Sequence, residues 1–207
     1  MLQGIGSHLV RVYRGSNQVQ HNLNTILQME DVNGTDIFGI VKKQNDLIVD
    51  MGPQAMTAGH RCELWIASDY DLDHGYFVEL KRTRVLDGQR VAVEEALTDD
   101  VEGGSVVLPV AQTVGFRSGD AVVIVGAQSE SSRVKCLGGS AEPYSLDYAQ
   151  YTALTLYDDC ALSNSYEAGD VVRASTFHRV IDLQAPDATA PYRIVTLLQI
   201  AAQGALD

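Results

Sequence analysis

The sequence predicts a mainly β protein, built from antiparallel β-barrel or β-sandwich modules with hairpins and very little helix. Two dipeptides, Asn33-Gly34 and Asp87-Gly88, lie between runs that contain apolar residues. Both suit the type I′ turn that joins antiparallel strands, because their residues tolerate a positive φ. Several further runs are short and rich in β-branched or aromatic residues, which is typical of strands. Helical periodicity is weak throughout the chain.

The expected elements follow in chain order. A first hairpin turns at Asn33-Gly34 within residues 27–41, and a second turns at Asp87-Gly88 within residues 77–93. Alternation of apolar and charged residues in the second hairpin predicts strands with one solvated face. Residues 93–97 and 145–150 could each form one or two helical turns. Four more strands are expected at residues 105–110, 121–125, 151–157 and 194–200.

The composition indicates a globular protein with an acidic surface. The chain has 207 residues, of which 45% are hydrophobic and 20% charged, enough to build a core. Its net charge is −12, from 27 acidic and 15 basic residues, so recognition of a specific nucleic-acid sequence is not expected. The sequence has no apolar run that predicts a membrane span and no secretory signal, so we expect synthesis in the cytoplasm.

Three regions are expected along the chain. Residues 1–104 form an N-terminal region rich in β-hairpins, and acidic and glycine residues at positions 99–104 interrupt the strand pattern. Residues 105–183 form a β-barrel module. Residues 184–207 form an extended linker and a C-terminal strand, because Pro186 and Pro191 restrict the backbone before that strand. We expect the final strand to reach a neighbouring chain.

One pattern occurs three times, at residues 56–60, 116–120 and 166–170. It consists of a large apolar residue, any residue, Ala or Ser, Gly and a polar residue, and each copy precedes a strand-like run. We expect the glycine to adopt a positive φ in a turn that buries the large side chain. Repeated use of a common β-turn and duplication of a module both explain the pattern.

An acidic segment, Asp69 to Asp73, resembles the start of a calcium-binding loop. The resemblance fails further on, because Gly75 lies one place late and Leu80 occupies the position of the bidentate glutamate. A solvated acidic loop is the preferred interpretation, and calcium binding stays an open alternative.

No catalytic, cofactor-binding or metal-binding residue is predicted, and we do not expect an enzyme. The five histidines have no metal-ligand spacing, and the chain has no nucleophile elbow and no phosphate-binding glycine loop. Cys62, Cys136 and Cys160 are odd in number and widely spaced, which favours buried thiols over disulfides. An enzyme would need a site that converges only in the fold.

The only basic cluster is Lys81-Arg82-Thr83-Arg84, beside the Asp87-Gly88 turn. A solvated hairpin end that discourages edge-to-edge pairing is one interpretation. The other is a patch that meets an acidic face of a neighbouring copy.

Residues 105–173 resemble a small β-barrel module of virion structural proteins from tailed bacteriophages. The resemblance lies in strand 106–108, Phe116 followed by Arg-Ser-Gly-Asp, strand 121–124, strand 153–156, and Tyr166 followed by Glu-Ala-Gly. It covers roughly a third of the chain, with a longer insert from Leu137 to Tyr151, and does not extend to residues 1–104.

This resemblance implies a structural subunit of a bacteriophage virion, without a cofactor, made in the host cytoplasm and located in the virion. A ring-forming neck or head–tail connector protein, or a tail protein, is expected to assemble through β edges and extended arms. Its expected partners are copies of itself and neighbouring virion proteins. Two alternatives are a capsid decoration protein and a carbohydrate-binding β-sandwich that uses exposed aromatic residues such as Trp65, Tyr70 and Tyr76.

Overall fold

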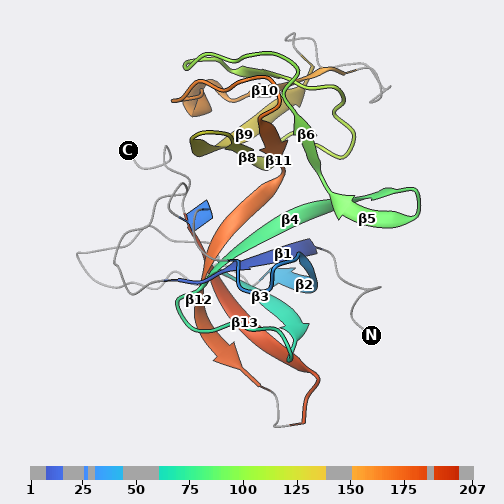
Figure 1. Cartoon of the computed structure of the whole chain (residues 1–207), viewed down its shortest axis with the longest axis vertical. Helices are drawn as coiled ribbons and strands as arrows, with labels where there is room; N and C mark the ends of the chain where they lie inside the picture. Colours follow the sequence, from blue (N-terminus) through green and yellow to red (C-terminus); the bar gives the residue numbers. More distant parts are fainter. Residues whose placement is uncertain are drawn as a thin grey trace, which may run out of the picture. The chain divides into compact units, whose positions relative to one another are not determined.

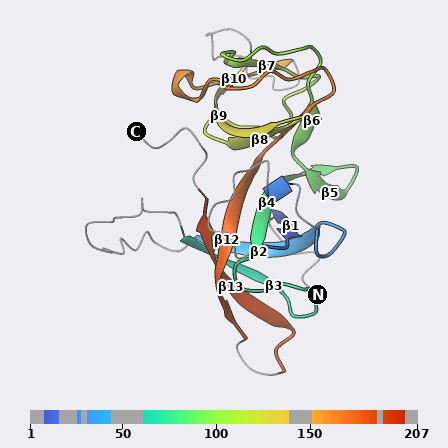
Figure 2. The same cartoon turned by 60° about the vertical axis from the view of Figure 1, so that its left-hand side comes forward.

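The computed structural model confirms a mainly β fold with antiparallel strands and very little helix. It describes residues 8–15, 26–27, 31–43, 61–138, 151–185 and 189–200. The strands form a curled sheet and a six-stranded barrel (Figures 1 and 2). Within the described residues, no helix is long and apolar enough to cross a membrane.

The chain divides into two compact units. The first comprises Met1–His21, Thr25–Lys81 and Thr176–Ala201, and the second comprises Asn22–Asn24, Arg82–Ser175 and Ala202–Asp207. The chain therefore passes between the units inside one strand, after Lys81, and near the start of another, after Ser175. Residues 99–104, where an interruption was expected, lie inside the second unit, because Val101 pairs there with Tyr166.

The first sheet has seven strands. Its spatial order is β1 (His8–Tyr13), β2 (Ile37–Lys43), β3 (Arg61–Ala67), β13 (Tyr192–Gln199), β12 (Ser175–Gln184), β4 (Phe77–Leu86) and β5 (Gln89–Ala92). β1 also pairs with β4, so the sheet curls back on itself. The alternating burial of β3 shows how one sheet face encloses a core, which includes Val10, Leu64, Val78, Val180 and Val195.

The expectation that the C-terminal strand extends to a neighbouring chain is wrong. β13 lies inside the first sheet and pairs antiparallel with β12 on one side and β3 on the other. Gln184 pairs with Ile194, so β12 and β13 form a hairpin around the proline-containing segment. Val195 and Leu197 of β13 are fully buried, and this apolar face explains why the strand folds back into its own sheet.

The two expected hairpins have different outcomes. Asp87 and Gly88 have φ values of 49° and 78° and connect β4 to β5, which confirms the second hairpin. The first is wrong, although Gly34 does adopt a turn conformation with φ of 66°. The strand after this turn, β2, pairs with β1 and β3, and no pairing joins it to the described residues directly before the turn.

The Asn33-Gly34 turn forms without a hairpin because a side chain holds it. The Asp31 carboxylate accepts hydrogen bonds from the backbone N–H groups of Asn33 and Gly34, at 3.2 and 3.1 Å. Asp31 itself bridges to Tyr13 of β1. This Asx-type turn satisfies the local backbone and leaves the flanking residues to pair along β1.

The second unit contains the six-stranded barrel. Its strand order is β6 (Glu94–Ala96), β11 (Val171–Arg173), β8 (Ala121–Val125), β9 (Ser129–Leu137), β10 (Ala153–Leu156) and β7 (Val107–Pro109). The bridge between Leu97 and Val110 connects the two end strands and closes the barrel. Its core includes Leu108, Phe116, Ile124, Leu154 and Tyr166.

The helical turn expected at residues 93–97 is wrong, because Glu94–Ala96 forms strand β6 and pairs antiparallel with β11. Pairing within the barrel overrides the weak local preference for helix. The other expected helical turn, at 145–150, lies outside the described residues. A short 3-10 helix at Asp158–Cys160 follows β10.

Two copies of the repeated pattern adopt the same structure. Gly119 and Gly169 have φ values of 85° and 100°, and Phe116 and Tyr166 are each 3% exposed. In the first loop the Asp120 carboxylate accepts a hydrogen bond from the backbone N–H of Arg117. In the second loop the Asp170 carboxylate accepts the same bond from Glu167. The third copy, residues 56–60, lies outside the described residues. Repeated use of a common β-turn and duplication of a module both explain the similarity of the two loops.

Replacing Gly119 tests the positive φ of this loop. A Cβ at position 119 would meet no atom within 4 Å, so any cost comes from the backbone conformation alone. Gly119→Ala should lower the free energy of unfolding by about 1 kcal/mol, and Gly119→Asn by less, because asparagine tolerates this region. Urea unfolding measures both, and equal losses for the two variants would contradict this explanation.

Candidate functional site

The acidic segment Asp69 to Asp73 does not converge on a common point. Asp71 forms an ion pair with Arg14 at 3.6 Å, whereas Asp73 accepts a hydrogen bond from the backbone of His74 at 2.7 Å. Leu72 between them is buried in the first core. Among the described residues, no group of three or more His, Cys, Asp or Glu side chains could hold a metal ion.

The three cysteines are free thiols in different environments. Cys62 faces the first core, and burial raises its pKa to about 11. Cys136 and Cys160 are half-buried in the second unit. Burial and the neighbouring Asp159 raise the pKa of Cys160, so neither of these two effects activates it as a nucleophile.

His178 is buried in β12 of the first unit, with 5% of its surface exposed. Its Nδ1 atom has no hydrogen-bond partner in the structure. Burial lowers the pKa of His178 to about 4, and the nearby His8 acts in the same direction. His178 is therefore neutral at pH 7. Of the other histidines, His74 is exposed, and His21 and His60 lie outside the described residues.

The basic cluster at residues 81–84 is occupied by internal ion pairs. Lys81 Nζ lies 2.9 Å from both carboxylate oxygens of Asp36. Arg82 pairs with Asp120, and Arg84 Nη2 lies 2.8 Å from Glu95 Oε1. Each pair lies within one unit. The cluster therefore has no unpaired cation to offer, and its interpretation as a patch for a neighbouring copy loses its basis.

Lys81 belongs to a polar network on the face of β1 and β4 that points away from the first core. Asp36 also accepts a hydrogen bond from Arg11 Nε at 2.8 Å, and Asp31 lies 3.3 Å from the same nitrogen. On the same face, the Tyr13 hydroxyl donates to the fully buried Glu79 at 3.0 Å. These contacts connect β1, β4 and the segment before β2, which suits a structural role.

The three aromatic residues expected to bind carbohydrate do not form one site. Tyr70 and Tyr76 pack against the first core, whereas Trp65 lies on the opposite face of β3. Trp65 stacks on Tyr192 with ring centroids 5.2 Å apart, and Lys42 Nζ lies 3.8 Å from the Trp65 ring. Tyr192 and Lys42 come from the two strands that flank β3, so both faces of the indole are covered.

The outer face of the first sheet carries candidate binding residues that the sequence did not predict. Arg61 of β3 pairs with Leu198 of β13, and Leu198 pairs with Arg179 of β12. Directly paired residues share a sheet face, so these three form one row, called here the arginine row. All three are half-buried, and neither guanidinium has an ion-pair partner among the described residues. Alternation places Arg61 outward, but only the strand register brings Arg179 beside it.

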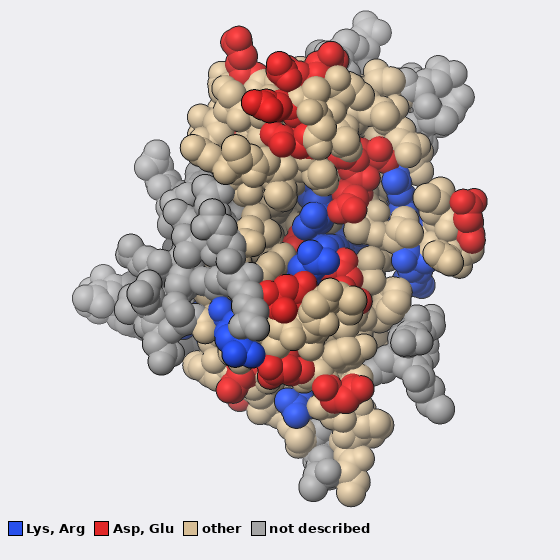
Figure 3. Space-filling view, in the orientation of Figure 1, with Lys and Arg blue, Asp and Glu red and all other residues tan. Residues whose placement is uncertain are grey.

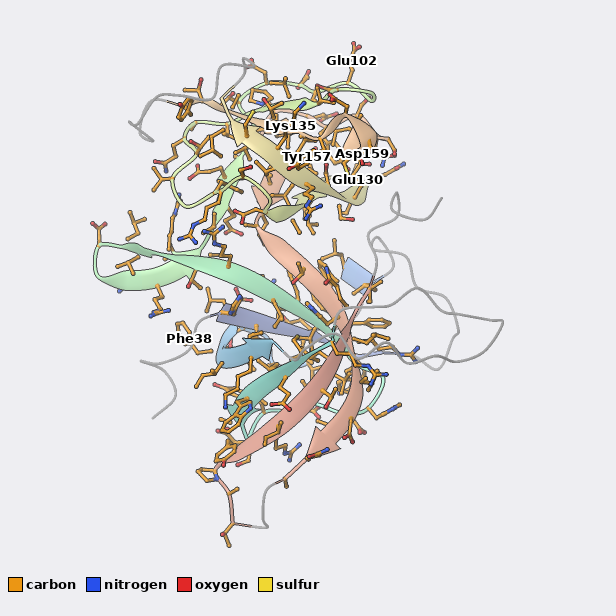
Figure 4. The ribbon with its side chains drawn as sticks, turned by 180° about the vertical axis from the view of Figure 1, so that it is seen from behind. Phe38, Glu102, Glu130, Lys135, Tyr157 and Asp159 are labelled. Carbon is orange, nitrogen blue, oxygen red and sulfur yellow. The ribbon has the colours of Figure 1, made fainter. Side chains whose placement is uncertain are left out.

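Acidic side chains gather on the barrel of the second unit (Figure 3), and several belong to two of its loops. The loops are joined by the Val101–Tyr166 bridge and by a hydrogen bond from Ala168 N–H to Asp100, at 2.9 Å. The term acidic loops refers here to their exposed carboxylates, those of Asp99, Asp100, Glu102 and Glu167. Glu102 points away from the barrel (Figure 4). None of the four has an ion-pair partner among the described residues.

Comparison with known proteins gives no family assignment. No protein-family model matches the sequence, and no curated protein matches it.

Removing the acidic partner of Lys81 tests the polar network. The Lys81 side chain is only 4% exposed, so Asp36→Ala would leave a buried cation unpaired and should cost about 3 kcal/mol of unfolding free energy. Adding Lys81→Met should recover most of this loss, because the buried charge is then absent. A double-mutant cycle by urea unfolding measures the coupling, and purely additive losses would contradict it.

His178 should make the first unit sensitive to acid. The unfolded chain binds a proton near pH 6.5, whereas the folded chain does so only near pH 4. Stability is therefore complete above pH 6.5 and declines as the pH falls toward 4, by up to roughly 3 kcal/mol. Replacing the side chain, as in His178→Leu, should flatten this decline, whereas His74→Leu should not. Denaturant titrations between these pH values test it, and equal pH slopes for His178→Leu and the wild type would refute it.

Proposed function

We propose that the protein is a structural subunit of a bacteriophage virion, either a ring-forming neck or head–tail connector protein or a tail protein. The observation that carries the proposal is the fold of the segment that resembles the phage module. Residues 105–173 contain β7 to β11, five of the six barrel strands. The two aromatic loops of the resemblance, at Phe116 and Tyr166, share one conformation.

The structure changes the expected mode of assembly, which was through β edges and extended arms. The barrel is closed by the Leu97–Val110 bridge, and β13 is paired on both sides. Subunit contacts through extended C-terminal residues 192–199 or through barrel edges are therefore not part of the proposal. Contacts through side chains on strand faces and loops take their place.

The carbohydrate-binding alternative receives less support. Glycan recognition commonly uses an aromatic ring with an open face, and Tyr192 and Lys42 cover both faces of Trp65. Tyr70 and Tyr76 contribute to the first core. The aromatic residues that suggested this function thus have structural partners.

Sedimentation with virions tests the proposal. The native protein, detected by antibody or mass spectrometry in its source lysate, should co-sediment with particles of virion size through a density gradient. It should remain with them after a high-salt wash, because a built-in subunit is held by more than surface charge. Cryo-EM of these particles would then distinguish neck, tail and capsid-surface positions. Recovery only at the top of the gradient, as a small species, would contradict the proposal.

A further inference from the structure

The arginine row is a charged surface whose guanidinium groups have no ion-pair partner in the described part of the chain. Arg61 and Arg179 flank Leu198 on adjacent strands, so their Cα atoms are separated by two strand spacings, roughly 10 Å. Most other described cations are engaged, including Arg11, Lys81, Arg82, Arg84 and Arg173 in ion pairs. Arg117 and Arg193 also have no ion pair among the described residues, but Arg61 and Arg179 share one row of the sheet in a chain whose net charge is −12.

The acidic loops have the complementary character. Their four carboxylates are exposed, come from two loops that are hydrogen-bonded together, and have no cation partner in the described part of the chain. Two other exposed carboxylates of the barrel have a cation partner, whereas Asp159 has none among the described residues. Asp158 pairs with Lys135 at 3.2 Å, and Glu94 pairs with Arg173 at 2.8 Å.

We propose that the arginine row of one copy binds the acidic loops of a second copy of this chain. The two surfaces have opposite charge and lie on different units, and neither has an ion-pair partner among the residues that the structure describes. Leu198, between the arginines, supplies apolar area that strengthens the charge contacts when water is excluded. This inference rests on the proposed function, because it specifies how subunits of the virion structure meet.

Such a contact joins two different surfaces, so it is heterologous. After one contact forms, the first copy keeps unused acidic loops and the second keeps an unused arginine row, so the addition of further copies continues until a ring closes. A ring is the assembly expected of a neck or connector protein.

A second copy fits this surface better than a nucleic acid does. Duplex DNA carries one negative charge per about 1.7 Å of its axis, so a protein that binds it needs many cations. The arginine row supplies two. The net charge of −12 also repels a polyanion at long range. The acidic loops supply four carboxylates on two hydrogen-bonded loops, enough to pair with two guanidinium groups.

Charge reversal with rescue tests the contact. The purified full-length chain is examined by sedimentation velocity over a range of concentrations at about 0.15 M salt. The wild type should associate in a concentration-dependent manner. R61E/R179E and E102K/E167K should each raise the dissociation constant about tenfold or more, because each places like charges at the contact. An equimolar mixture of the two variants should recover association, since each reversed surface then meets one of opposite charge.

A matched control separates the specific contact from the change in net charge. R133E/K135E alters the net charge by the same amount as R61E/R179E, at exposed positions of the barrel, and should leave association unchanged. Circular dichroism and thermal unfolding establish that all variants are folded.

Three results would overturn the inference: a wild type that stays monomeric, reversals without effect, or variants that fail to rescue each other. Loss of DNA binding with unchanged self-association in R61E/R179E would assign the row to nucleic acid and overturn it too. If the protein co-sediments with virions but the reversals leave self-association intact, the proposed function stands and this contact fails.

Discussion

Closure of the two sheets is the constraint on which the other features depend. In the second unit, the Leu97–Val110 bridge and the hydrogen bond from Thr98 N–H to the Pro109 carbonyl, at 3.1 Å, connect the first and last strands of the barrel. In the first unit, pairing of β1 with β4 curls the sheet around its core. These pairings leave the barrel without an open edge, whereas β5 ends the first sheet and pairs only with β4 among the described strands. Recognition by the barrel is therefore left to side chains.

Closure also determines where charged side chains find partners. β4 places Lys81 on one side and Arg82 and Arg84 on the other, and each meets a carboxylate of a different strand or loop: Asp36, Asp120 or Glu95. In sequence these residues form a single basic run, but in the fold Lys81 pairs in the first unit and Arg82 and Arg84 pair in the second. A local cluster of charge is thus divided among separate structural contacts. Arg61 and Arg179, which have no ion pair among the described residues, come together only because strands distant in sequence become neighbours.

The sequence was informative where structure depends on adjacent residues. The Asp87-Gly88 hairpin, the strands at 105–110 and 121–125, and the buried aromatic residues of the Gly-Asp loops follow from local backbone preferences and apolar patterns. The pairing partner of each strand does not follow from such local preferences. Asn33-Gly34 makes a turn, yet β2 pairs with β1, and β13 inserts between β12 and β3. The arginine row depends on the register of three strands at once, and no local pattern contains that information.

The net charge of −12 imposes a condition on any association between copies. Like-charged copies repel one another out to about one Debye length, which is about 10 Å at 0.1 M salt and longer at lower salt. Contacts between the arginine row and the acidic loops would act at hydrogen-bond distance, where salt screens much less and Leu198 excludes water. Raising the salt from very low values therefore weakens the repulsion before it weakens the contact. Association by this surface should be strongest at intermediate ionic strength, whereas simple attraction between an acidic and a basic protein declines steadily from the lowest salt.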